Sequence, residues 1–78
     1  MARYGKNSKK SPEQVLDAAI KFFGGLGLES KDTSAGCARF EGGGGFVAIS
    51  TCPKEHGCEV DLETQEWDLQ VRQFLGKI

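Results

Sequence analysis

The first repeating pattern of apolar residues along the chain is that of an amphipathic helix. Ser11, Pro12 and Gln14 are typical of a helix start, with serine at the N-cap, proline in the first turn and glutamine three residues after the cap. The glycines at positions 24 and 25 are typical of a helix end. The apolar residues that follow the start recur at the spacing of one helical face, and they are Val15, Ala19, Phe22, Phe23 and Leu26.

Two runs rich in β-forming residues follow, and four consecutive glycines separate them. Residues 37–41 and 46–52 flank the glycines at 42–45, which predicts a β-hairpin whose turn requires positive φ angles. Centring the turn between the second and third glycine pairs Phe40 with Val47. The same register pairs Ala38 with Ile49, and these four side chains then share one face.

A strict alternation of apolar and acidic residues marks a third strand at residues 58–63. Such alternation is typical of a strand that buries one face and exposes the other. With Val60 and Leu62 on the buried side, the side exposed to water carries Glu59, Asp61 and Glu63.

The segments between and after these strands complete the prediction. Residues 26–30 begin a short edge strand, and residues 31–36 and 53–57 form polar turns. A second amphipathic helix begins near residues 64–66 and continues to the end of the chain. Its apolar stripe consists of Trp67, Val71, Phe74, Leu75 and Ile78.

The predicted fold class is α+β, with the element order helix, three or four antiparallel strands, helix (α-β-β-β-β-α). Each helix has one apolar stripe and the sheet has one apolar face, so both helices are expected to cover that face in a two-layer sandwich. Residues 1–10 are expected to form a flexible basic arm, and residues 11–78 a single α+β domain.

The distribution of charge limits the classes of partner. Of the ten basic residues in the 78-residue chain, four lie within residues 1–10, which contain no acidic residue. The rest of the chain is acidic, and an acidic body argues against nucleic-acid binding, apart from weak binding through the basic arm. The longest apolar run is four residues, which excludes a membrane-spanning helix, and the chain start lacks a signal-peptide pattern, so we expect a cytosolic protein.

Part of the chain resembles the helix-grip group, the START and Bet v 1-like domains, in which an antiparallel sheet wraps a long C-terminal helix. The resemblance covers residues 26–78, and two stretches carry it. The first is Arg39-Phe40-Glu41 with residues 42–47, and the second is residues 59–63 leading into Trp67, Val71 and Phe74. Larger members of the group enclose an apolar ligand cavity, whereas this chain is much shorter. A single TATA-binding-protein-like half is an alternative analogy, and neither analogy by itself implies a function.

Three cysteines and one histidine form a candidate metal site. Together they offer the ligand set of a structural zinc ion, although the spacing C-x₃-H-x-C is not that of a common zinc motif. The predicted register also separates them, with Cys37 and Cys52 on the exposed face and Cys58 on the core face. The alternative is that Cys58 is a small core residue and the other two are ordinary thiols. The four candidate ligands are Cys37, Cys52, His56 and Cys58.

The sequence contains no pattern that favours an enzyme. The four glycines precede a strand rather than a helix, so they do not form a phosphate-binding loop. The acidic ladder of the third strand provides no pocket in which paired carboxylates would acquire different pKa values. His56 could in principle act as base for a neighbouring cysteine, but an exposed turn residue is the simpler interpretation.

One aromatic residue on the exposed face has no obvious cover. The register places Phe46 there together with Arg39 and Ala48, and an exposed aromatic side chain can mark a contact surface. We therefore expect a module that binds another protein or a small ligand, without catalysis and without a cofactor, and a homodimer that buries this surface. The alternatives are a structural module stabilised by zinc and weak nucleic-acid binding through the arm.

Overall fold

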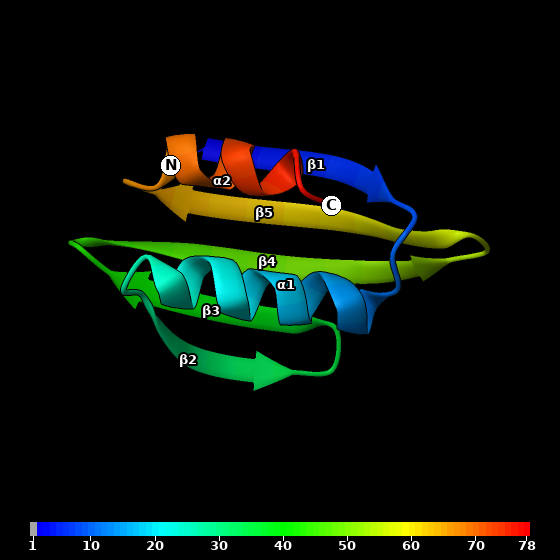
Figure 1. Cartoon of the computed structure of the whole chain (residues 1–78), viewed down its shortest axis with the longest axis horizontal. Coiled ribbons are helices and arrows are strands. Elements are labelled where there is room, and N and C mark those ends of the chain that lie inside the picture. The colour runs from blue at the N-terminus through cyan, green and yellow to red at the C-terminus, as the bar shows by residue number, and fades with distance from the viewer. Residues whose placement is uncertain (1) are drawn as a thin grey trace.

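The computed structural model describes residues 2–78 and has an α+β fold with one five-stranded antiparallel sheet and two helices (Figure 1). The strands follow one another across the sheet in the order β1-β5-β4-β3-β2, so β1 and β2 form its edges. The elements in chain order are β1 (Ala2–Ser8), α1 (Pro12–Gly25), β2 (Glu29–Ser34), β3 (Cys37–Gly42), β4 (Gly45–Lys54), β5 (Gly57–Gln65) and α2 (Asp68–Leu75).

The central hairpin has the predicted register. Phe40 pairs with Val47 and Ala38 pairs with Ile49. The turn between β3 and β4 uses Gly43 at φ 57° and the next glycine at φ 82°, conformations that glycine adopts without steric cost.

The expectation of a flexible arm at residues 1–10 is wrong for residues 2–8, which form the edge strand β1 and pair with β5 along their whole length. The polar side chains of β1 are held by α2 and the end of the chain. Tyr4 donates a hydrogen bond from Oη to Asp68 (3.0 Å), Lys6 Nζ donates to the carbonyl oxygen of Leu75 (2.6 Å), and Ser8 Oγ donates to that of Ile78 (3.1 Å). The Leu75 carbonyl lies at the C-terminal end of α2, where a cation is favourable, whereas Ile78 follows the helix.

The number of strands therefore exceeds the predicted three or four. The edge strand predicted to begin within residues 26–30 continues to Ser34, so the polar turn expected at residues 31–36 is confined to its last residues. Every side chain of β2 is exposed. An edge strand with this composition lacks the apolar alternation by which strands are recognised, which explains why its length was underestimated.

The start of α1 is confirmed in detail. Ser11 Oγ accepts a hydrogen bond from the backbone N–H of Gln14 (3.2 Å), and the Gln14 side chain accepts one from the backbone N–H of Ser11 (3.0 Å). The second helix begins later than predicted, at Asp68, because β5 continues to Gln65. Trp67 precedes the helix and donates a hydrogen bond from Nε1 to the carbonyl oxygen of Gly42 (2.9 Å), which joins this segment to the central hairpin.

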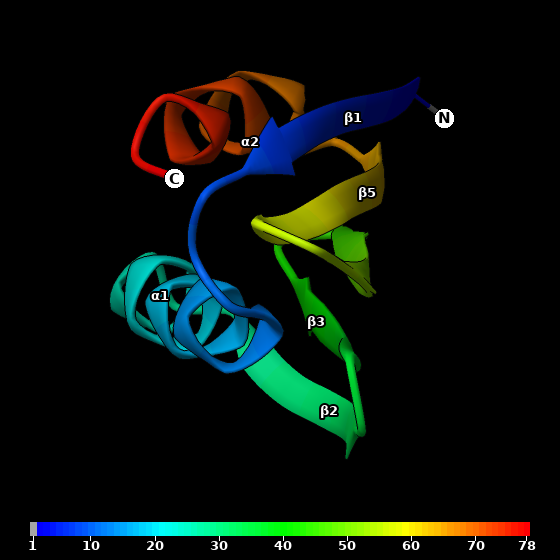
Figure 2. The ribbon, with the colours of Figure 1, turned by 90° about the vertical axis from the view of Figure 1, so that its right-hand side faces the viewer.

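The placement of the helices differs from the expected sandwich in which both lie over one common face of a short sheet. Helix α1 lies against β2, β3 and β4, whereas α2 lies against β5 and β1. Figure 2 shows the sheet nearly end-on as a bent band, with each helix beside a different end of it. The reason is the extra strand β1, which widens the sheet enough for each helix to have its own half.

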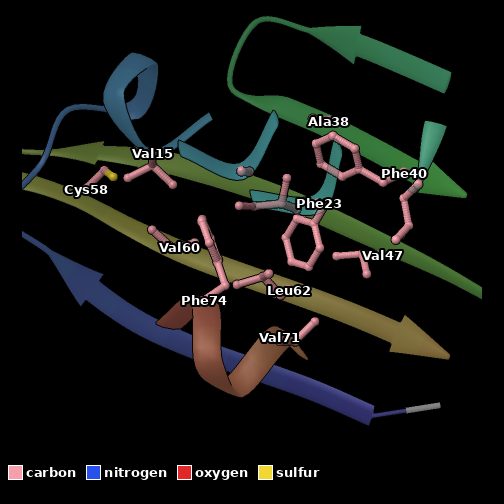
Figure 3. Packing of buried hydrophobic residues seen from close by; sticks show 13 residues of the cluster. Val15, Phe23, Ala38, Phe40, Val47, Cys58, Val60, Leu62, Val71 and Phe74 are labelled. Atoms are coloured by element: carbon pink, nitrogen blue, oxygen red, sulfur yellow. The ribbon is translucent and has the colours of Figure 1, made fainter. Parts of the chain in front are cut away.

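Aromatic side chains join the two halves of the molecule into one core (Figure 3). The ring of Phe23 from α1 lies 5.3 Å from that of Phe74 in α2 and 5.4 Å from that of Phe40 in β3, measured between centroids. Val60 and Leu62 are buried, as predicted from the alternation of β5. The buried apolar cluster consists of Val15, Ala19, Phe23, Leu28, Ala38, Phe40, Val47, Ile49, Cys58, Val60, Leu62, Val71 and Phe74.

Candidate functional site: the open face of the sheet

The candidate site is the sheet surface opposite the buried side chains, which we call the open face. A shallow depression of about 270 Å³ lies over it, and all twelve residues that line the depression belong to strands, so neither helix contributes among the residues described. The charged and polar side chains that line the depression are Arg3, Asp32, Ser34, Cys37, Arg39, Ser50, Asp61 and Glu63.

The strand register arranges these side chains in rows that cross the sheet. One row, which we call the charged row, follows the pairs Arg3–Glu63, Glu63–Ala48, Ala48–Arg39 and Arg39–Asp32. It crosses all five strands and has Ala48 at its centre, on β4. Because residues opposite each other in neighbouring strands point to the same face, these five side chains form one line on the open face.

Two further rows flank the charged row. On one side, Phe46 of β4 lies between Gln65 of β5 and Glu41 of β3. On the other side, Ser50 of β4 lies between Asp61 and Cys37. The open face is thus polar at most positions, with Phe46 and Ala48 as its apolar centre.

Phe46 is half-buried although no helix covers it, because Arg39 lies over its ring. The guanidinium carbon is 4.4 Å from the ring centroid, a cation–π arrangement. The same guanidinium donates a hydrogen bond from Nε to Glu41 Oε2 (3.0 Å). The sequence placed Phe46 on this face without cover, and the structure adds Arg39 as its cover.

The acidic side chains of β5 are also on the open face. Asp61 Oδ2 lies 3.4 Å from Arg3 Nη2, a loose ion pair between exposed groups that contributes little to stability. At the margin of the sheet, Glu29 and Lys31 of β2 form a tighter pair at 2.9 Å. Their hydrogen bond lowers the pKa of Glu29 and raises that of Lys31.

The four candidate zinc ligands are not gathered at one place. Cys37 and Cys52 are exposed, whereas Cys58 is buried in the core, and His56 lies in the exposed turn between β4 and β5. In the part of the chain that the structure describes, no three histidine, cysteine or acidic side chains are grouped as a metal site requires. Burial raises the pKa of the Cys58 thiol, and the nearby Cys52 adds to this shift, so Cys58 is a poor thiolate donor.

The positions of the cysteines predict their reactivity. With excess Ellman's reagent, Cys37 and Cys52 of the native protein are expected to form mixed disulfides rapidly, each displacing one nitrothiobenzoate thiolate from the reagent, whereas Cys58 reacts only after unfolding in denaturant. The Cys58→Ala variant should lose the denaturant-dependent thiol and keep the two rapid ones. Three rapid thiols in folded protein would contradict the burial of Cys58.

The sequence did not single out Arg3, Asp32 or Glu63 as members of a site. Arg3 and Asp32 belong to strands that were interpreted as an arm and a turn, so the register that aligns them with Arg39 and Ala48 could not be drawn. Glu63 was placed on the exposed face but without a neighbour. The signal that could have located β1 is the single aromatic at position 4, opposite Leu62 in the strand pair.

Within residues 2–78, neither helix is long and apolar enough to cross a membrane. No family model matches the chain, and no curated protein sequence matches it either.

Proposed function

We propose that this protein is a non-catalytic interaction module that binds another protein through the open face of its sheet, with Arg39, Phe46 and Ala48 at the centre of the contact. The observation that carries the proposal is an arginine stacked on a half-buried phenylalanine in the middle of an uncovered five-stranded sheet. Aromatic residues and arginine are enriched in protein interfaces and dominate their binding energy.

The shape of the open face supports a protein partner over a small ligand. Its depression is shallow and open to solvent, whereas small-molecule sites are concave and enclose most of the surface of the ligand. The space between helices and sheet, where a helix-grip protein would hold a ligand, contains the packed rings of Phe23, Phe40 and Phe74.

The chemistry of the available groups supports binding without catalysis. The cysteine of the core is kept as a thiol by burial, which makes it a weak nucleophile. The carboxylates of β5 lie on an open surface rather than in a closed pocket. The three cysteines are free thiols, two of them exposed, which fits the reducing cytosol that we propose as the compartment.

A protein partner is better supported than the nucleic-acid alternative. Lys6 donates a hydrogen bond to the carbonyl oxygen of Leu75, so one of the four cations near the chain start is already bonded to α2. A phosphate backbone would have to compete with this contact next to an acidic strand.

Site-specific photo-crosslinking tests the proposed function. A photoreactive amino acid in place of Ala48 is expected to crosslink a protein in cells that express the chain at its natural level, because this position lies at the centre of the open face. The matched control carries the same amino acid in place of Gln73, an exposed residue of α2. Absence of any product specific to position 48 would contradict the proposal.

A further inference from the structure

We propose that the partner of the open face is a second copy of this chain, docked face to face about a two-fold axis that runs along β4. This inference rests on the proposed function, since it names the partner of the same surface. It is carried by the order of charges across the sheet, which is self-complementary about the central strand.

A two-fold axis along β4, midway between two facing sheets, places β4 over the partner's β4. It places β5 over the partner's β3 and β1 over the partner's β2, because the strand order across the sheet is β1-β5-β4-β3-β2. Antiparallel sheets that pack face to face keep their strands nearly aligned, so this arrangement is a common packing geometry. Residues on β4 meet their own counterparts, as an isologous interface requires.

The two-fold rotation places each charge of the charged row opposite a charge of the other sign in the partner's row. Read across the sheet it is Arg3, Glu63, Ala48, Arg39 and Asp32, so the charges on one side of Ala48 are opposite to those at equal distance on the other. Glu63 therefore faces the partner's Arg39, and Arg3 faces the partner's Asp32. Each pair occurs twice in the dimer, which makes four oppositely charged contacts from one row.

The flanking rows are compatible with the same axis. Phe46 lies on β4 and faces the partner's Phe46, each ring already covered on one side by Arg39 of its own chain. Gln65 faces the partner's Glu41, so an amide donor meets a carboxylate acceptor. On the other side, Asp61 faces the partner's Cys37, and Ser50 faces itself. In these three rows of residues that the structure describes, no two like charges face each other.

The area of the face is sufficient for a dimer of moderate strength. Five strands at the usual spacing and a ten-residue central strand give a surface of roughly 20 by 30 Å, or about 1,200 Å² for both copies together. This value is near the lower limit for a stable interface. Most of its specificity comes from exposed charges, so we expect added salt to weaken the dimer.

The decisive experiment uses two variants of the chain, each with one reversed charge in the charged row. Arg39→Glu and Glu63→Arg are each expected to weaken self-association by about tenfold or more, because each homodimer then contains two like-charge contacts. An equimolar mixture of the two variants is expected to form a heterodimer, since Glu at position 39 of one chain then faces Arg at position 63 of the other. The chain with both substitutions should dimerise again. Sedimentation velocity over a concentration series gives the dissociation constants.

The control substitutions are Lys21→Glu and Asp17→Arg, which reverse exposed charges on α1 and should leave dimerisation unchanged. Circular dichroism verifies that each variant is folded. If a variant at position 39 or 63 does not fold, Arg3→Glu and Asp32→Arg test the same axis at the margins of the sheet. A mixture of folded variants that remains monomeric overturns the inference, as does a wild-type chain that is monomeric at high concentration and low salt.

The crosslinking experiment distinguishes failure of the dimer proposal from failure of the proposed function. A product at position 48 with twice the mass of the chain supports both. A product that contains a different protein overturns the second copy as partner while the interaction module stands. No product at position 48, together with a monomeric wild type, overturns both.

Discussion

Phe23→Ala is expected to lower the free energy of unfolding by about 3–5 kcal/mol, the range observed when a large aromatic side chain is removed from a packed core. Phe23 is fully buried, and its ring contacts those of Phe22, Phe40 and Phe74, which come from both helices and the sheet. A domain of this size has only about 3–5 kcal/mol of total stability, similar to the expected loss, so a large fraction of the variant should be unfolded at 37 °C. Urea denaturation followed by circular dichroism measures the loss.

The matched control for this substitution is Ile20→Ala on the same helix. Ile20 is 40% exposed, so its truncation removes little buried surface, and alanine favours the helix. We expect a change of less than about 1 kcal/mol. Equal losses for the two variants would mean that Phe23 does not connect the two halves of the core.

Gly57→Ala is expected to lower the free energy of unfolding by about 2–4 kcal/mol, because it combines a strained backbone with a steric overlap. Gly57 begins β5 at φ 113°, where L-residues are strained. An added Cβ would overlap the carbonyl oxygen of Ser8 and lie 2.8 Å from Lys9 Cα. The end of β1 should therefore separate from β5, which urea denaturation and faster amide hydrogen exchange in residues 2–8 would detect.

The matched control is Gly44→Ala in the hairpin turn. Gly44 also has a positive φ, of 82°, but nothing lies within 4 Å of an added Cβ. The Gly44→Ala variant should lose only about 1 kcal/mol of unfolding free energy, because backbone strain is its only cost. If Gly57→Ala costs no more than this control and leaves the exchange of β1 unchanged, the close approach of β1 to the start of β5 is contradicted.

The elements predicted from sequence are those whose cause is local. The cap of α1 needs only Ser11 and Gln14, three residues apart. The hairpin needs glycines that accept positive φ between two β-forming runs, and its register follows from the position of the turn. The alternation of apolar and acidic residues in β5 predicts its buried side even when the neighbouring strands are unknown. These signals extend over a few residues and were interpreted correctly.

The elements that were missed depend on contacts between distant residues. β1 contains one large apolar residue, Tyr4, and becomes a strand because β5 offers it a free edge and α2 offers partners for its polar side chains. Tyr4 and Asp68 are 64 residues apart in sequence. The same difficulty applies to the open face, since the charged row exists only after β1 and β2 have been placed at opposite edges of the sheet.

The sequence by itself determined the α+β class, the hairpin register, the separation of Cys58 from the two exposed cysteines, and the position of Arg39, Phe46 and Ala48 on the exposed face. The hairpin register follows from the position of its turn, and the other features follow from periodicity, which records the side of an element that turns away from water. Only the tertiary structure decided that residues 2–8 close one edge of the sheet, that each helix covers its own half, and that Arg3 and Asp32 complete the charged row. Polar edge strands bury few apolar side chains, so their position is set by backbone hydrogen bonds to a distant strand, and these leave no pattern in the sequence.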